Sequence, residues 1–215
     1  MILEILVVEP LMNNAYLIAD EKSRDAVVVD PAMGAQAILE KLSGVKARLR
    51  YILNTHGHYD HIADNSPLRE ATAAKIAIHR EDAHRLEEDA SEALRYMPII
   101  PPASKADILL AEGAMIEVGS LVLKALHTPG HTEGSSCFYL EEEGLLFTGD
   151  TLFAGTCGRT DLRGGDPLRM VESLARLSTL PLRVKVYPGH GLPTTIGAEG
   201  WIARPSTVKS LLGLV

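Results

Sequence analysis

The stretch THGHYDH, residues 55–61, follows the apolar run YILN and places three histidines and an aspartate within six residues. A lone histidine beside a glycine carries little information. Chance explains His56, His58, Asp60 and His61 in a single loop poorly. Imidazole and carboxylate groups are ligands of zinc, iron and manganese in proteins. The stretch therefore predicts a metal-binding loop directly after a strand.

Three other places share this arrangement of a polar residue among glycines just past a predicted strand. They are His131 in TPGHTEGS, Asp150 in FTGDTLF and His190 in YPGHGLP. The full set holds five imidazoles and two carboxylates, whereas calcium and magnesium prefer shells of oxygen. Seven donors exceed the needs of one tetrahedral zinc and suit two metals that share a bridging carboxylate. Three histidines outside such loops are interpreted as surface or core residues: His79, His84 and His127.

Composition narrows the classes of protein that this chain can represent. Its 215 residues fit one domain, residues 1–215, and 46% hydrophobic with 23% charged residues are ordinary for a globular protein. The net charge of -7 argues against a nucleic-acid partner, because phosphate binding needs a basic surface. We therefore expect a small-molecule substrate. The sequence does not indicate an oligomeric state.

The cellular compartment is predicted from the length of the apolar runs and from the spacing of the two cysteines. No apolar run approaches the roughly 20 residues that span a bilayer, and the start MILEILVVEP lacks a basic signal-peptide region. We therefore expect neither a membrane segment nor a signal peptide. Cys137 and Cys157 lie far apart and form no paired motif, so no disulfide framework is expected. These features predict a reducing, cytoplasmic setting, with Cys157 as a structural residue.

Short β-rich runs alternate with helical segments in both halves of the chain. Helices are expected over residues 34–43, 65–74, 80–90 and 165–177, the last with Asp166 as its N-cap and Pro167 at its first position. Prolines interrupt residues 96–107, which we interpret as a packed linker, with a lid over Met97–Ser104 as the alternative. The rhythm predicts an α/β fold of two sheets with helices outside.

The ordered pattern HxHxDH, then His, Asp and His at glycine-rich strand ends, resembles the metallo-β-lactamase superfamily. The resemblance extends from NNAYLI and VVDPA to PGHG, and TGDTLF and CGR are most similar to glyoxalase II-type hydrolases. It implies an αβ/βα four-layer sandwich of two mixed β-sheets with helices on the outer faces. It also implies two divalent metal ions, zinc first, with iron or manganese as alternatives. One metal would be held by His56, His58 and His131, the other by Asp60, His61 and His190, with Asp150 bridging.

The chemistry that this resemblance implies is hydrolysis by a hydroxide shared between two metals. Asp60 is expected to be both ligand and orienting acceptor for the proton of the nucleophile, and Asp150 is the second catalytic carboxylate. A thiolate leaving group has a pKa near 8.5 and departs without a general acid, whereas an amide nitrogen needs protonation. We therefore expect a thioester or an activated ester as substrate, rather than a β-lactam.

Arg159 in CGRTD matches a position where glyoxalase II enzymes commonly have a Lys or Arg that meets the substrate carboxylate. A salt bridge with Asp161 is the alternative role. Only 25 residues follow His190, so the helical extension of the glutathione-binding enzymes is expected to be absent. Asp161 and Leu192 replace aromatic residues of that group, which weakens the expectation of glutathione specificity.

Two other functions compete with the hydrolase. CGRTD also resembles the persulfide dioxygenases of the same superfamily, which use one iron held here by His56, His131 and Asp150. PGHGLPTTIG is more similar to the hydrolase branch. A non-catalytic metal-binding scaffold predicts damaged ligands, and all seven are intact in this sequence.

Overall fold

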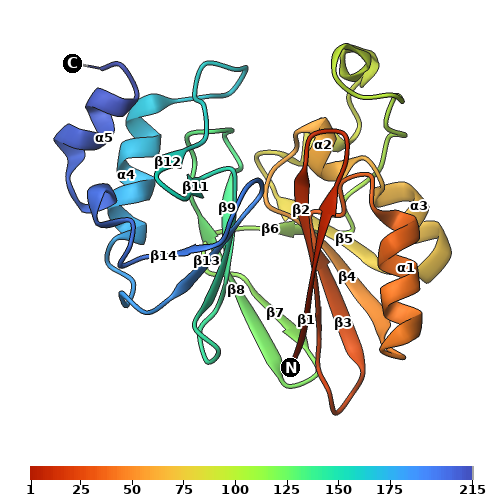
Figure 1. Ribbon diagram of the computed structural model, residues 1–215. Coiled ribbons are helices and arrows are strands. Elements are labelled where there is room, and N and C mark those ends of the chain that lie inside the picture. Colours follow the sequence, from red (N-terminus) through yellow and green to blue (C-terminus); the bar gives the residue numbers. More distant parts are fainter. Residues whose placement is uncertain (215) are drawn as a thin grey trace.

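The computed structural model describes residues 1–214, and its centre is a pair of six-stranded mixed sheets (Figure 1). The first sheet has the order β1-β2-β3-β4-β5-β6. Its strands are β1 (Ile2–Val8), β2 (Asn13–Ala19), β3 (Asp25–Val29), β4 (Arg48–Asn54), β5 (Lys75–His79) and β6 (Ile108–Leu110). The first three are antiparallel, and β3 to β6 run parallel because crossover connections return the chain to the same end.

The second sheet has the order β14-β13-β10-β9-β8-β7 and is antiparallel except between β10 and β13. Its strands are β7 (Met115–Val118), β8 (Leu121–His127), β9 (Ser136–Leu140), β10 (Leu145–Gly149), β13 (Lys185–Pro188) and β14 (Thr194–Thr195). Two very short strands, β11 (Leu152–Phe153) and β12 (Thr156–Cys157), pair separately. Both sheets are therefore mixed, as expected.

Helices cover the outer face of each sheet, which completes four layers (Figure 1). The first sheet carries α1 (Ala35–Gly44) and α3 (Asn65–Thr72), and the second carries α4 (Pro167–Leu177) and α5 (Pro205–Leu211). Shorter turns of helix are α2 (Tyr59–Ile62), η1 (Ala83–Leu86), η2 (Ser91–Arg95) and η3 (Gly200–Ala203). The predicted αβ/βα sandwich of the metallo-β-lactamase type is confirmed.

Three apolar cores hold these layers together, and strand periodicity assigns side chains to them. In β2, Leu17 packs toward the helices of the first sheet, whereas Tyr16 and Ile18 enter the core between the two sheets. In β10, Leu146 packs against α4 and Phe147 faces the central core. Because both faces of these strands are buried, their sequences are continuous apolar runs.

Three of the four predicted helices are present, and one is not. The carboxylate of Asp166 accepts hydrogen bonds from the backbone nitrogens of Leu168 and Arg169, and Pro167 begins α4, as expected. The helix expected over residues 80–90 is wrong, because only the single 3₁₀ turn η1 forms there. Asp82, which directly precedes η1, is buried. Its carboxylate accepts hydrogen bonds from loops that are distant in the sequence, rather than from solvent. Among residues 1–214, no helix has the length and apolarity that crossing a bilayer requires.

Candidate metal centre

The loop after β4 carries four of the predicted ligands. Gly57 must lack a side chain, because a Cβ there would lie 2.6 Å from the Cβ of Arg85. His58 then precedes α2, whose first turn contains Asp60 and which buries His61 completely. All four predicted ligands of this loop thus come from one tight turn and one turn of helix.

The other three predicted ligands follow strands of the second sheet. His131 lies between β8 and β9, Asp150 directly follows β10, and His190 follows β13. Gly149, at the end of β10, has a φ of 48°, and a Cβ there would collide with the Thr55 hydroxyl. This close approach brings the end of β10 against the histidine loop of the first sheet.

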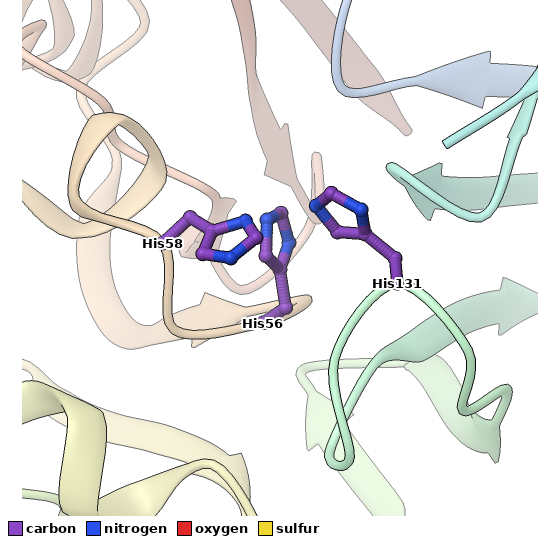
Figure 2. Close-up of side chains that lie close together, drawn as sticks. All are labelled: His56, His58 and His131. Carbon is purple, nitrogen blue, oxygen red and sulfur yellow. The ribbon is translucent and has the colours of Figure 1, made fainter. Parts of the chain in front are cut away.

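The predicted ligands converge into two triads at this end of the sandwich. Within each triad the ligand atoms lie within 4.8 Å of one another, and the members are His56, His58 and His131 in one and Asp60, His61 and His190 in the other. Figure 2 shows the first triad: His56 and His58 come from one loop, and His131 enters from the opposite side. These are the two groups that the family resemblance implied.

Asp150 lies between the triads. Its Oδ1 is 3.5 Å from Nε2 of His61, and its Oδ2 is 3.5 Å from Nε2 of His131 and 3.8 Å from Nε2 of His190. Oδ1 thus faces the second triad, and Oδ2 lies near a member of each triad. A carboxylate so placed can bridge two cations.

Hydrogen bonds on the far side of two rings fix the tautomer of those ligands. Nδ1 of His131 donates to the carbonyl oxygen of Arg159 at 2.7 Å, and Nδ1 of His190 donates to the carbonyl oxygen of Leu11 at 3.1 Å. A carbonyl oxygen only accepts, so Nδ1 carries a proton, and in the neutral ring Nε2 keeps its lone pair. Both rings therefore present a ligand atom to the centre.

Two more rings are fixed through Asp30, a residue that the sequence analysis did not assign to the site. Oγ1 of Thr55 donates to Oδ2 of Asp30 at 2.6 Å and so accepts from Nδ1 of His56 at 3.0 Å. Nδ1 of His61 donates to the same Asp30 oxygen at 3.0 Å. The signal in the sequence that indicates Asp30 is the motif VVDPA.

The atoms that point into the centre fit bound cations. Nε2 of His56, His61 and His131 and Oδ1 of Asp150 are buried and have no hydrogen-bond partner among the described residues. Buried polar atoms without partners are costly and rare. These four atoms lie at one centre. They are imidazole nitrogens and a carboxylate oxygen, which are the ligand atoms that zinc, iron and manganese bind in proteins.

Electrostatics around the second triad also call for positive charge. Burial opposes protonation of His61, but the carboxylates of Asp60, Asp150 and Asp30 outweigh it and raise the pKa of His61 to about 10. Burial works against ionisation of Asp60 as well, yet His61 and His190 hold the pKa of that carboxyl far below its usual range. Asp60 is thus a carboxylate, and the pocket attracts a cation.

The first triad behaves differently, since two of its rings, those of His56 and His58, stay neutral. Burial, followed by the neighbouring imidazoles, lowers the pKa of His56 well below its ordinary value. The same causes lower the pKa of His58 to about 3, although Asp60 opposes them. A neutral imidazole is the form that ligates a metal.

The centre opens into a cavity of about 480 Å³. Its wall includes Leu11, Tyr59, Arg85, Tyr96, Arg159 and Leu162, and the ligands His58, Asp60, His131 and Asp150 border it. Arg159 makes the expected alternative contact, a two-point salt bridge in which Nε and Nη2 each lie 2.7 Å from a carboxylate oxygen of Asp161. Its role in substrate binding stays a prediction.

Residues 8–190 match the sequence model of the Metallo-beta-lactamase superfamily. The chain belongs to the metallo-β-lactamase superfamily. A hydroxyacylglutathione hydrolase of Cereibacter sphaeroides is 40% identical over 190 residues, which cover 87% of this chain and 66% of that protein. The hydroxyacylglutathione hydrolase of Pelagibacter ubique is 34% identical over 189 residues, 87% of this chain and 71% of its own length. The chain thus spans about two thirds of these relatives.

Three solved structures of the superfamily are similar to this chain over nearly its full length. BLEG-1 B3 metallo-beta-lactamase has a TM-score of 0.85 and 35% identity, covering 92% of this chain and 96% of its own. TTHA1623, in a di-iron-bound form, has a TM-score of 0.80 and 36% identity over 94% and 98% of the two chains. ETHE1 from Myxococcus xanthus has a TM-score of 0.77 and 29% identity over 99% and 97%.

Residues that the sequence analysis placed outside the site lie outside the two triads. His79 and His127 stack at 3.9 Å with an angle of 11° between their rings. With Glu81 they form a separate group whose ligand atoms lie within 4.8 Å of one another, outside the two triads. His84 lies on the surface, with its Nε2 atom 3.5 Å from Oε1 of Glu88. In the segment Met97–Ser104, the alternative lid, Met97 is buried against Ala63 and Ala93. Tyr96, which precedes this segment, borders the cavity.

Proposed function

We propose that this chain is a metal-dependent hydrolase of thioesters, similar to glyoxalase II, with a hydroxyacyl thioester as its substrate. The observation that carries the proposal is the pair of triads with Asp150 between them, beside an open cavity that Asp150 helps to line. The relatives from Cereibacter sphaeroides and Pelagibacter ubique are named hydroxyacylglutathione hydrolase, which supports the substrate class.

Seven residues would hold the two ions: His56, His58, Asp60, His61, His131, Asp150 and His190. Two divalent ions, when bound, supply an activated water near neutral pH and polarise the acyl carbonyl. Zinc is our first proposal for their identity, and the di-iron form of TTHA1623 supports iron as an alternative. The histidine donors suit both metals.

Asp60 is proposed to orient the attacking water. Its Oδ2 accepts a hydrogen bond from Nδ2 of Asn13 at 2.9 Å, which fixes the carboxylate plane at the cavity wall. The low pKa of Asp60 keeps it ionised, so that it can accept a hydrogen bond from a water molecule and orient it. Asn13 thereby supports the same residue without contacting substrate.

The cavity favours a leaving group that departs without protonation. Tyr59 and Tyr96 line it, and burial raises the pKa of both phenols, that of Tyr96 to about 12. Such phenols are poor proton donors at neutral pH. A thiolate leaves unaided, whereas an amine does not. These residues support thioesters over amides.

Arg159 is proposed to bind a carboxylate of the substrate. Arg159 borders the cavity, and its guanidinium donates two hydrogen bonds to the carboxylate of Asp161. A substrate carboxylate would compete with Asp161 for the same donors. Arg159 therefore places a cationic group in the same cavity as ligands of both triads.

The decisive test combines metal content with turnover. Protein purified without added metal is analysed for zinc, iron and manganese per chain, and is then assayed with a hydroxyacyl thioester of glutathione and of a second thiol. We expect close to two ions per chain and thiol release, with no hydrolysis of the matching amide. The His58→Ala variant is the control for contaminating esterases. Two ions per chain without turnover of either thioester would refute the proposal.

A second candidate function is a persulfide dioxygenase with one iron held by His56, His131 and Asp150. It is supported by the CGRTD motif and by the similarity to ETHE1 over 99% of this chain. One iron per chain, together with oxygen uptake on a glutathione persulfide, would favour it over the hydrolase.

A further inference from the structure

The three-histidine triad is assembled from loops of both sheets. His56 and His58 come from the loop after β4 in the first sheet, and His131 comes from the loop after β8 in the second (Figure 2). Their spacing therefore depends on how these two loops are held together. The turn after β5, residues 80–86, lies between them and supplies Asp82 and Arg85.

The carboxylate of Asp82 is fully buried and bonds to both loops. Its Oδ2 accepts from the backbone nitrogen of Gly57 at 2.8 Å and from Oγ1 of Thr132 at 2.7 Å. Its Oδ1 accepts from the backbone nitrogen of Gly134 at 2.7 Å. Gly57 stands between His56 and His58, and Thr132 follows His131 directly. One carboxylate thus links the two loops that carry the three ligands.

Arg85 packs against the same junction. A Cβ on Gly57 would lie 2.6 Å from the Cβ of Arg85, so the loop rests on this side chain. Nη2 of Arg85 donates to Oε2 of Glu133 at 2.6 Å and to the carbonyl oxygen of Arg163 at 3.0 Å. Nε of Arg85 lies 3.4 Å from Oδ1 of Asp82, which places a positive charge beside the buried carboxylate. The charge of Asp82 is therefore compensated.

We propose that Asp82 is a positioning residue for the three-histidine site and sets the metal affinity of that site separately from the other. The second triad is supported elsewhere, by Asn13 on Asp60 and by Asp30 on His61. Among the described residues, Asp82 makes no hydrogen bond to the second triad. The inference rests on the metal centre and is independent of the substrate.

The variant Asp82→Asn tests this because an amide has one acceptor oxygen where the two loops need two. Whichever way the amide turns, its NH₂ group faces the backbone N–H of Gly57 or that of Gly134. Either way one backbone hydrogen bond between the side chain and a ligand loop is lost, while the shape of the side chain is kept. Loss of such an outer partner weakens metal binding by roughly 10- to 100-fold.

The two sites are separated by measuring in two backgrounds. His190→Ala removes a ligand of the second triad, and His58→Ala removes one of the first. Metal-free full-length protein of each background is titrated with Zn²⁺ alone by calorimetry, with and without Asp82→Asn. We expect about 10- to 100-fold weaker binding in the His190→Ala background, and unchanged binding in the His58→Ala background.

Asp20→Asn is the matched control. Asp20 is also buried and accepts from the nitrogen of Lys22 at 3.1 Å, Oγ of Ser23 at 3.0 Å and the nitrogen of Ser120 at 2.9 Å. It thereby links the β2–β3 hairpin to the β7–β8 turn without touching a ligand loop. Its loss is expected to lower the melting temperature and leave zinc affinity unchanged. Equal losses of affinity for Asp20→Asn and Asp82→Asn, or for both backgrounds, would overturn the proposal.

Should Asp82→Asn not fold, Thr132→Val makes the same test with a smaller change. It removes only the hydroxyl that donates to Asp82 at 2.7 Å. Weaker Zn²⁺ binding in the His190→Ala background alone supports the proposal, and unchanged binding there refutes it. The titration contains no substrate, so a failure of the proposed thioesterase activity leaves this result intact.

Discussion

Replacing Thr55 by Val tests whether a single hydroxyl fixes the tautomer of a metal ligand. The Thr55 hydroxyl donates to Asp30 at 2.6 Å and accepts from Nδ1 of His56 at 3.0 Å, and all three side chains are buried. Valine keeps the shape and removes both bonds. The loss of a hydrogen bond to a charged partner costs roughly 1.5–3 kcal/mol, and an unpaired buried N–H costs roughly 1–3 kcal/mol.

These two costs overlap, so we expect the free energy of unfolding of the metal-free protein to fall by about 3 kcal/mol. For a chain of this size that is a decrease in melting temperature of about 6–12 °C. His56 can avoid the unpaired N–H by moving its proton to Nε2, the atom that faces the triad. That tautomer cannot ligate, so zinc affinity is expected to fall roughly 10- to 100-fold.

The measurements are thermal unfolding of the metal-free protein and calorimetric titration with Zn²⁺. Thr72→Val is the control, because the Thr72 hydroxyl also donates one hydrogen bond and accepts another. It donates to the carbonyl oxygen of Leu68 and accepts from the nitrogen of Ala74, far from the ligands. It should lower stability without changing zinc affinity. If Thr55→Val lowers the melting temperature as expected but binds zinc like the unaltered chain, the tautomer argument is wrong.

Four further predictions concern the proposed activity and the surroundings of the site. Asp60→Asn should abolish turnover and leave the melting temperature within a few degrees of the unaltered chain; a fully active variant would contradict the role of this carboxylate. Arg159→Ala should raise KM for a thioester that carries a carboxylate and leave kcat nearly unchanged, and an unchanged KM would assign Arg159 to its salt bridge alone. Burial raises the pKa of Cys157 to about 11, so at pH 8 only about one molecule in a thousand carries the thiolate, and alkylation by iodoacetamide should be slow and should accelerate as the pH rises toward 11; rapid labelling at pH 8 would contradict this. Tyr16→Phe removes a buried hydroxyl that donates to the carbonyl oxygen of Pro188 at 2.6 Å, and should cost roughly 1 kcal/mol of stability, measured by urea unfolding, with no loss expected if the bond is absent in solution.

The sequence predicted those parts of the molecule that depend on local patterns. The β-rich run of β2 and the cap at Asp166 are properties of a few neighbouring residues, and both lie where expected. The ligand set was also accessible, because each ligand stands in a short glycine-containing loop after a strand. The order of these loops along the chain, together with the family resemblance, indicated which donors share a triad.

The supporting residues could not be predicted in the same way. Asp30 and Asp82 resemble ordinary acidic residues in turns, and the charged run around Asp82 favoured a solvent-facing helix over residues 80–90. Only the docking of the two sheets shows that both carboxylates are buried and accept hydrogen bonds from loops that carry ligands. Such contacts, separated by 25 residues or more, leave no local pattern.

The position of these two carboxylates explains how one centre can be built from both halves of the sandwich. Asp30 holds His61 directly and His56 through Thr55, so it fixes ligands within the first sheet. Asp82 reaches from the first sheet to the loop of the second, and therefore fixes the distance between halves. A buried carboxylate suits both tasks, because it accepts several short hydrogen bonds at once and is costly to leave unpaired. The precision of the metal centre thus depends on acids that do not themselves belong to either triad.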